Sequence, residues 1–198
     1  DTTRELKTTR ALSYHFKDIH TVGNFTNTYG LRYEDTRSDK GTHANASSSK
    51  AGIEDSQTMI GLATNYNMGN GMSVFAGFHE GYSPPLAAAD AAADPEESDN
   101  LEIGFRMSKP SSYIELVYFF VDYQNLLETC TTSGGCTGDI GTNKNAGSAE
   151  VRGIEFQYRN KNIFSSPQMK GVSQADSMRF PILVSATLQN AEYTSNTD

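Results

Sequence analysis

Thr58-Met-Ile-Gly-Leu-Ala-Thr-Asn-Tyr66 is the stretch that decides the fold, because its side chains alternate between two kinds. The apolar members are Ile60, Leu62 and Tyr66, and the small or polar members between them are Gly61, Ala63 and Asn65. Successive side chains of a β-strand point to opposite faces, so a period of two gathers the apolar side chains on one face. The stretch therefore predicts a strand with one apolar face and one polar face.

The same alternation recurs along the chain and divides it into about eight antiparallel strands, each near the length of a tilted membrane-crossing strand. Helical periodicity is nearly absent. Ser112–Leu127 fits less well, because Val117, Phe119 and Val121 make its second face apolar too. The predicted strands are Glu5–Lys17, Asn24–Asp35, Thr58–Tyr66, Met72–Tyr82, Asn100–Met107, Ser112–Leu127, Val151–Tyr158 and Phe180–Tyr193.

The predicted connections differ in length at the two ends of the strands. Short turns on one side and long loops on the other are typical of outer-membrane barrels. One connection breaks this rule, since Asn160–Arg179 is long where a short turn is expected. The short turns are expected at Asp18–Gly23, Met68–Gly71 and Ser108–Ser111, and the long polar loops at Ser38–Asp55, Ser83–Asp99 and Glu128–Ser148.

The composition narrows the class of protein. The net charge of -8 repels phosphate backbones, and with no basic cluster present we expect no nucleic-acid partner. No segment reaches the roughly 18 consecutive apolar residues of a membrane-spanning helix. The mean hydropathy of -0.54 is typical of soluble proteins, but a membrane barrel exposes only every second side chain to lipid. A soluble β-sandwich binding module and a passive or structural outer-membrane barrel therefore stand as alternatives.

Catalytic and metal-binding patterns are missing from the sequence. Ser83 lies in Gly-Tyr-Ser-Pro-Pro, which lacks the Gly-x-Ser-x-Gly turn of serine hydrolases. The histidines are scattered and never stand at the spacing of a two-histidine metal motif; they are His15, His20, His43 and His79. We therefore expect no enzymatic activity, no metal site and no resident cofactor.

The two cysteines, Cys130 and Cys136, enclose the short Gly-rich stretch Thr-Thr-Ser-Gly-Gly. An even number of cysteines in one loop is easily bridged, so we expect a disulfide and an oxidising compartment. Reduced loop thiols, or half of a metal site, are the alternatives.

Five ordered blocks resemble the C-terminal half of the barrel of TonB-dependent receptors, particularly those of the ferric dicitrate type. Each block alone is weak, but their order along the chain is specific. The first is Tyr29-Gly-Leu-Arg-Tyr-Glu34, and the second is Ser73–Pro85, which ends in Gly-Tyr-Ser-Pro-Pro. The others are Glu96–Arg106, similar to Pro-Glu-x-x-x-x-x-Glu-x-Gly, Val121-Asp-Tyr-Gln-Asn-Leu-Leu127, and Asn145-Ala-Gly147 followed by Val151-Arg-Gly-Ile-Glu155.

The resemblance implies that residues 1–198 are part of one transmembrane β-barrel domain of roughly 22 strands, whose lumen holds a plug domain. The plug and the TonB box are expected outside this chain. The chain is then the wall and extracellular loops of a transporter in the bacterial outer membrane. Its expected partners are outer-membrane lipid, the plug, TonB through the missing N-terminal region, and a small ferric chelate such as a siderophore or ferric citrate.

Within this reading, loop arginines are the candidates for ligand binding, because ferric chelates are usually anions and Arg grips their oxygens with two parallel hydrogen bonds. Arg37 and Arg152 lie near the loop ends of their predicted strands. A solvated or salt-bridged Arg at the rim is the alternative. The small inward residues Gly61, Gly77, Gly104 and Gly153 either face a closely packed plug or mark bends in the strands.

Overall fold

A computed structural model of the chain describes residues 5–42, 51–85, 93–134, 140–141, 143–161 and 181–196. Strands dominate these residues, with one 3-10 turn at Thr132–Gly134. The main strands are β1 Glu5–Val22, β2 Phe25–Thr42, β3 Ala51–Gly69, β4 Met72–Ser83, β5 Glu96–Ser108, β6 Ser112–Gln124, β9 Gly147–Asn160 and β10 Ile182–Asn196. The short strands β7 Leu127–Thr129 and β8 Asn143–Asn145 pair with each other.

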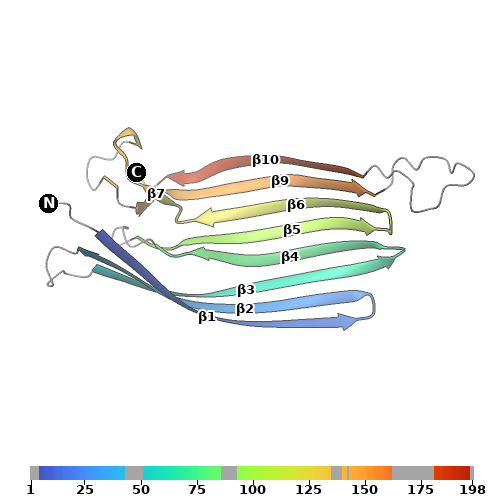
Figure 1. Ribbon diagram of the computed structural model, residues 1–198, viewed down its shortest axis with the longest axis horizontal. Helices are drawn as coiled ribbons and strands as arrows, with labels where there is room; N and C mark the ends of the chain where they lie inside the picture. The colour runs from blue at the N-terminus through green and yellow to red at the C-terminus, as the bar shows by residue number, and fades with distance from the viewer. Residues whose placement is uncertain are drawn as a thin grey trace, which may run out of the picture.

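The eight main strands form one antiparallel sheet in the order β1-β2-β3-β4-β5-β6-β9-β10 (Figure 1). Every neighbouring pair is antiparallel, and the order follows the chain apart from the β7–β8 hairpin. Within the described residues β1 and β10 each pair with one neighbour only, so the sheet is open. The prediction of an all-β antiparallel barrel wall with about eight strands is confirmed.

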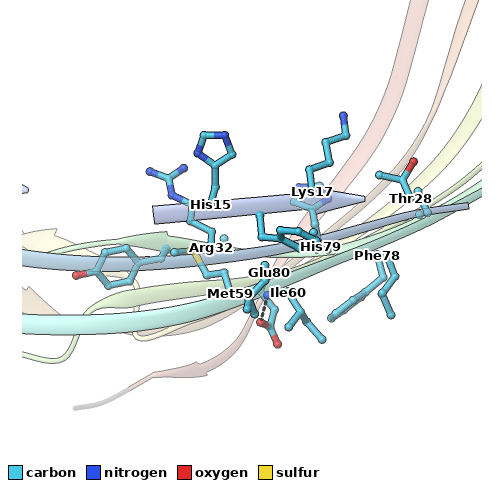
Figure 2. Close-up of a pocket in the computed structure, with 18 of the residues that line it drawn as sticks. His15, Lys17, Thr28, Arg32, Met59, Ile60, Phe78, His79 and Glu80 are labelled. Carbon is cyan, nitrogen blue, oxygen red and sulfur yellow. Dashed lines mark hydrogen bonds between the residues drawn. The ribbon is translucent and has the colours of Figure 1, made fainter. Parts of the chain in front are cut away.

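The strand register places nearly all large exposed apolar side chains on one face. Examples are Leu62 beside Tyr29, Ile103 beside Tyr118, and Ile154 beside Leu188. The other face is the concave one and carries Lys17 and Thr28 (Figure 2). A soluble sandwich is wrong for the described residues, because Ile60, Leu101 and Ile154 are 40%, 47% and 48% exposed instead of sealed between two sheets.

The apolar band on the convex face crosses the sheet obliquely. On β10 the last apolar side chain before the polar loop-side residues is Leu188, and on β1 it is Leu12. The register row through Leu188 reaches β1 at His20, eight residues (20 − 12) away from Leu12. That row runs through Ile154, Tyr118, Ile103, Ala76, Thr64 and Asn27.

This offset measures the tilt of the strands relative to the band. Eight residues at roughly 3.3 Å each, across seven inter-strand steps of roughly 4.8 Å, correspond to a tilt of about 38°. Strands of outer-membrane barrels tilt by roughly 35–45°. The apolar band is therefore parallel to the membrane plane when the strands are tilted as in a membrane barrel.

The turn-side connections are short because their residues accept left-handed backbone conformations. Gly23 has φ 57° and Asn70 has φ 54°. At Gly71, with φ 77°, a side chain would collide with the carbonyl oxygen of Ser108. The backbone N–H of Ser108 also donates to the Gly71 carbonyl at 2.7 Å, which joins two neighbouring turns.

Several predicted connections are wrong in extent: β5 already begins at Glu96, inside the loop expected at Ser83–Asp99, and two others differ more. The turn expected at Asp18–Gly23 is mostly strand, since β1 pairs with β2 as far as Val22. The loop expected at Ser38–Asp55 is also largely strand at both ends, because β2 reaches Thr42 and β3 starts at Ala51. Polar outward residues suggested a loop, although the backbone continues its ladder past the apolar band. Most of the predicted connection Asn160–Arg179 lies outside the described residues.

The pairing of β3 with β4 stops partway, at Gly61 opposite His79. Beyond this point side chains replace the backbone ladder. The Ile60 N–H donates to Glu80 Oε2 at 2.8 Å, and Gln57 Nε2 donates to Glu97 Oε1 at 2.6 Å. The Tyr82 hydroxyl donates to the Asp55 carboxylate and lies 3.0 Å from Thr36 Oγ1. Side chains thus close a seam that the backbone leaves open.

Candidate functional site

A hollow with a bare floor lies on the concave face of β1 to β5. Glycines from three strands form the floor: Gly30 pairs with Gly61, and Gly77 pairs with Ala63. A Cβ atom added to Gly61 or Gly77 would meet its nearest neighbour at 3.7 Å, an ordinary contact. The open volume here is about 680 Å³; Met59 and His79 also line it, and it extends to Ile60 and Glu80 where the pairing of β3 with β4 has stopped.

Charged and polar side chains surround this hollow. His15, Lys17, Thr28 and Arg32 project from β1 and β2 toward the concave side (Figure 2). Arg32 Nη2 lies 2.6 Å from Glu34 Oε2, so its charge has a partner within the wall. Lys17 makes no ion pair with any residue that the structure describes. Glu102, the cross-strand partner of Gly77, also lines the hollow and makes no ion pair with a described residue, so the hollow carries unpaired side chains of both charges.

Aromatic rings of the same sheet fill the space above two other glycines of the concave face. The Phe75 ring covers Gly104, its cross-strand partner. The Phe119 ring covers Gly153 in the same way, with ring atoms 2.7 and 2.9 Å from where a Cβ of that glycine would stand. The second apolar face of β6 thus has a packing reason, which the sequence pattern alone did not show.

A charged cluster that sequence reasoning missed lies on the concave face near the turns. Arg106 Nη2 lies 2.5 Å from Glu115 Oε2, and the Tyr113 hydroxyl donates to the same oxygen at 2.7 Å. The Arg106 guanidinium also stacks over the Phe75 ring at 4.9 Å, and that of Arg159 over Tyr113 at 5.2 Å. Arg106 and Glu115 lie directly opposite each other on β5 and β6. The sequence could have revealed this pair only if the register of the two strands were known.

The two arginines predicted to bind ligand lie apart, on β2 and β9, with four strands between them in the sheet. Both occupy the face of the apolar band, beyond its loop-side edge. Arg37 pairs with Glu54 and lies 3.4 Å from Asp39, and Arg152 lies 3.7 Å from Glu192. Each has a carboxylate partner and faces away from the concave side. Their role in ligand binding stays a prediction.

The loop-side connections are tied together by one asparagine from the quoted Asn145-Ala-Gly147 block. Asn145 Nδ2 donates to the carbonyl oxygens of Asp94 and Asn125, at 2.9 and 2.8 Å, and its Oδ1 accepts from the Asp94 N–H. Gly147 follows with φ 122°, a conformation that favours glycine. The block therefore fastens two loops to the end of β6.

Cys130 is 6% exposed and disulfide-bonded. Its predicted partner, Cys136, lies outside the described residues, so the pairing stays a prediction. Within the described part of the chain, no group of three or more His, Cys, Asp or Glu side chains is arranged to hold a metal ion. The same residues contain no helix long and apolar enough to span a membrane.

Residues 2–198 match the protein family described as "TonB dependent receptor-like, beta-barrel". A comparison with curated proteins found no match. The family name describes receptors, which agrees with the expectation that the chain is not an enzyme.

Solved structures of iron transporters and siderophore receptors share the fold. The FrpB iron transporter from Neisseria meningitidis (F3-3 variant) has a TM-score of 0.70 at 18% identity, with 94% of this chain and 26% of that chain covered. The ferric citrate transporter FecA in the unliganded form has a TM-score of 0.71 at 18% identity, covering 97% and 27%. The siderophore receptor PiuA from Acinetobacter baumannii has a TM-score of 0.74 at 16% identity, covering 96% and 26%.

These similarities establish the fold alone, and the chain spans only about a quarter of each matched structure's length. The ferric citrate transporter is one of several receptor kinds with this fold.

Proposed function

Because the chain belongs to the TonB-dependent receptor-like β-barrel family, we propose that it is the wall and extracellular loops of an outer-membrane transporter that imports ferric chelates with energy from TonB. In this proposal the remaining barrel strands, the plug and the TonB box belong to the same receptor. Residues 1–198 are one continuous part of its barrel domain, and the transported chelate is cargo, not a cofactor.

The observation that carries the proposal is the oblique apolar band. A soluble sheet gains nothing from leaving Leu62, Ile103 and Leu188 exposed on one face, at 46%, 56% and 78%. In hydrocarbon the same side chains are favourably solvated, and strand pairing satisfies the backbone, provided the barrel closes. The band's tilt of about 38° agrees with a membrane orientation.

A passive or structural barrel is the second candidate. The feature that favours the transporter is the family match, because the matching family is described as TonB dependent receptor-like. The two functions differ in their dependence on TonB. Passive transport continues without TonB, whereas active import stops.

The test is uptake of radioactive iron by cells that express the full-length receptor and lack their own ferric-chelate receptors. Iron is offered as citrate, catecholate or hydroxamate complexes in parallel. We expect at least one complex to accumulate, and accumulation to be lost in a strain without TonB or after collapse of the proton gradient. Uptake that survives both treatments would favour the passive barrel.

Arg37 and Arg152 can be tested in the same assay, as proposed contacts of an anionic chelate. Loss of a bidentate contact raises the KM for uptake, by about tenfold for a contribution of about 1.4 kcal/mol. An unchanged KM for Arg37→Ala and Arg152→Ala would mean that the two arginines serve only their ion pairs with Glu54 and Glu192. Arg32→Ala, on the concave face, is the matched comparison.

A further inference from the structure

A polar patch interrupts the apolar band on the convex face of β1, β2 and β3. It consists of Asp18 and His20 on β1, Asn27 on β2 and Thr64 on β3. Asn27 is the cross-strand partner of both His20 and Thr64, and Asp18 points to the same face two residues from His20. Along the register row of His20, the other strands carry Ala76, Ile103, Tyr118, Ile154 and Leu188. The patch is therefore confined to three neighbouring strands.

The patch lies inside the apolar band, near its turn-side edge. Phe16 lies on the loop side of Asp18 and Val22 on the turn side of His20, and both are exposed. His20 is eight residues (20 − 12) from Leu12, which corresponds to a height difference of about 21 Å at roughly 3.3 Å per residue and a tilt of about 38°. The apolar layer of an outer-membrane barrel is roughly 25 Å tall. His20 therefore lies just inside the turn-side boundary, and Asp18 lies about 5 Å deeper.

The four side chains of the patch make no hydrogen bond or ion pair with any residue that the structure describes. Other polar side chains of this face do have partners. Asn160 Nδ2 donates to the Tyr158 hydroxyl at 3.1 Å, and Arg152 lies 3.7 Å from Glu192. In hydrocarbon, a carboxylate and an amide without partners cost free energy. A polar ligand within the membrane would remove that cost.

The chemistry of the patch favours a zwitterionic ligand. The Asp18 carboxylate accepts from an ammonium group, whereas the imidazole of His20 and the amide of Asn27 donate N–H groups to an anion. The surrounding residues of this face on β1 to β3 carry no charge; they are Phe16, Val22, Phe25, Tyr29, Leu62 and Tyr66. Groups that suit an ammonium and a phosphate thus stand side by side, with apolar side chains around them.

Resting on the proposed outer-membrane transporter, we propose that the polar patch binds the headgroup of one phosphatidylethanolamine molecule. The short turns of outer-membrane barrels are periplasmic, so the patch faces the inner leaflet. The ammonium group of the lipid pairs with Asp18, and its phosphate accepts from His20 and Asn27. The acyl chains run from the headgroup toward the middle of the bilayer, over the exposed side chains of Phe16 and Leu62.

The test is native mass spectrometry of the full-length receptor, released from nanodiscs with equal amounts of phosphatidylethanolamine and phosphatidylglycerol. The two lipids share the phosphate and the acyl chains, but only phosphatidylethanolamine carries an ammonium group. Asp18→Asn removes the carboxylate with little change in size. Asp99→Asn is the matched control, because Asp99 is a carboxylate of the same face beyond the loop-side edge of the band. Far-UV circular dichroism checks that each variant is folded.

We expect the unaltered receptor to retain phosphatidylethanolamine with a preference of about tenfold, equivalent to about 1.4 kcal/mol. Asp18→Asn loses this preference, and Asp99→Asn keeps it. Replacing both His20 and Asn27 with Ala lowers the retention of both lipids, because their phosphates lose two donors. Equal retention of the two lipids by the unaltered receptor overturns the proposal. So does a preference that persists in Asp18→Asn, which would mean that Asp18 has its partner within the complete barrel.

A phosphatidylethanolamine analogue with a diazirine near its glycerol group locates the bound lipid. After irradiation of the receptor in vesicles, we expect crosslinks to peptides of β1 and β2, and labelling spread evenly over the apolar face would contradict the proposed site. TonB-dependent iron uptake by the same variants separates the two proposals. Uptake without a lipid preference refutes the lipid site alone, and a lipid preference without uptake refutes the transport function alone.

Discussion

At the scale of single residues, the glycines of the concave face differ in what surrounds them, and this difference has a measurable effect on stability. Gly153→Ala puts a methyl group 2.5 Å from the carbonyl oxygen of Leu188 and 2.7 Å from the Phe119 ring. Overpacking of this kind destabilises by about 1–3 kcal/mol. We expect a lower urea midpoint of unfolding for the full-length receptor in detergent, followed by far-UV circular dichroism.

Gly77→Ala is the matched control for that experiment. Its added methyl group meets the Cβ of Ala63 at 3.7 Å, so the wall accepts it without rearrangement. Equal losses of stability in the two variants would contradict the ring-over-glycine packing.

The faces of individual residues could be predicted from the sequence, but their neighbours could not. Alternation alone assigns Ile60 and Gly61 to opposite faces. It leaves Phe119 unexplained, because the glycine beneath this ring lies on another strand and is known only from the register. The hollow could not be predicted for the same reason, because its glycines lie on three separate strands and come together only through the register.

At the scale of strands, the seam between β3 and β4 depends on side chains. Glu80→Ala removes the acceptor of the Ile60 N–H, which lies 2.8 Å from Glu80 Oε2. A hydrogen bond contributes about 0.5–1.5 kcal/mol, so amide exchange at Ile60 accelerates by about two- to tenfold. Hydrogen exchange of the receptor in detergent measures this rate.

Glu80→Gln keeps an oxygen acceptor and is expected to preserve the protection of the Ile60 amide. The amide of Thr64, within the paired part of the ladder, serves as the internal reference. Acceleration at both amides in Glu80→Ala would mean that the whole ladder has opened, which contradicts a local role for this carboxylate.

Just beyond the apolar band, five neighbouring strands place carboxylates in one register row, which begins with Glu80 opposite Asp99. Asp99 pairs with Asp122, Asp122 with Glu150, and Glu150 with Glu192. Like charges directly opposite each other destabilise a strand pair. We therefore expect Asp122→Asn to raise the urea midpoint at low ionic strength, and Asp122→Glu to leave it unchanged.

Salt tests the cause of that gain, because repulsion between exposed charges is screened within roughly 10 Å at 0.1 M ionic strength. The advantage of Asp122→Asn over the unaltered receptor should shrink as salt increases. A lower midpoint for Asp122→Asn would instead show that Asp122 is stabilised by a favourable contact.

The number of strands and their order could be predicted, but several of their ends could not. Hydropathy ends a strand where its outward residues become polar, as at Asp18 or Arg37. The backbone pairing extends beyond the edge of the apolar band, because β2 and β3 are still paired at Arg37 and Glu54. Strands that are longer than the apolar layer make their polar ends look like loops.

At the scale of the whole molecule, the tilt of the strands is the property that separates a membrane wall from a flat soluble sheet. It is invisible in any one strand and emerges when the band edge is compared across the register, from Leu12 on β1 to Leu188 on β10. Each step between strands along a row changes the height by about 3 Å, for a spacing of roughly 4.8 Å and a tilt of about 38°.

Single spin labels on one register row test this geometry in the full-length receptor in lipid vesicles. Cysteines are introduced at Asn27 on β2, Ile103 on β5 and Leu188 on β10, which the strand pairing places in one row. Depth is read from the competition between oxygen and a water-soluble nickel complex for relaxation of each label. Over the six steps from Asn27 to Leu188 we expect a height change of about 18 Å, with Ile103 deepest in the hydrocarbon. Equal depths at the three positions would mean that the row lies parallel to the membrane, and labels exposed equally to the nickel complex would mean that this face does not meet lipid.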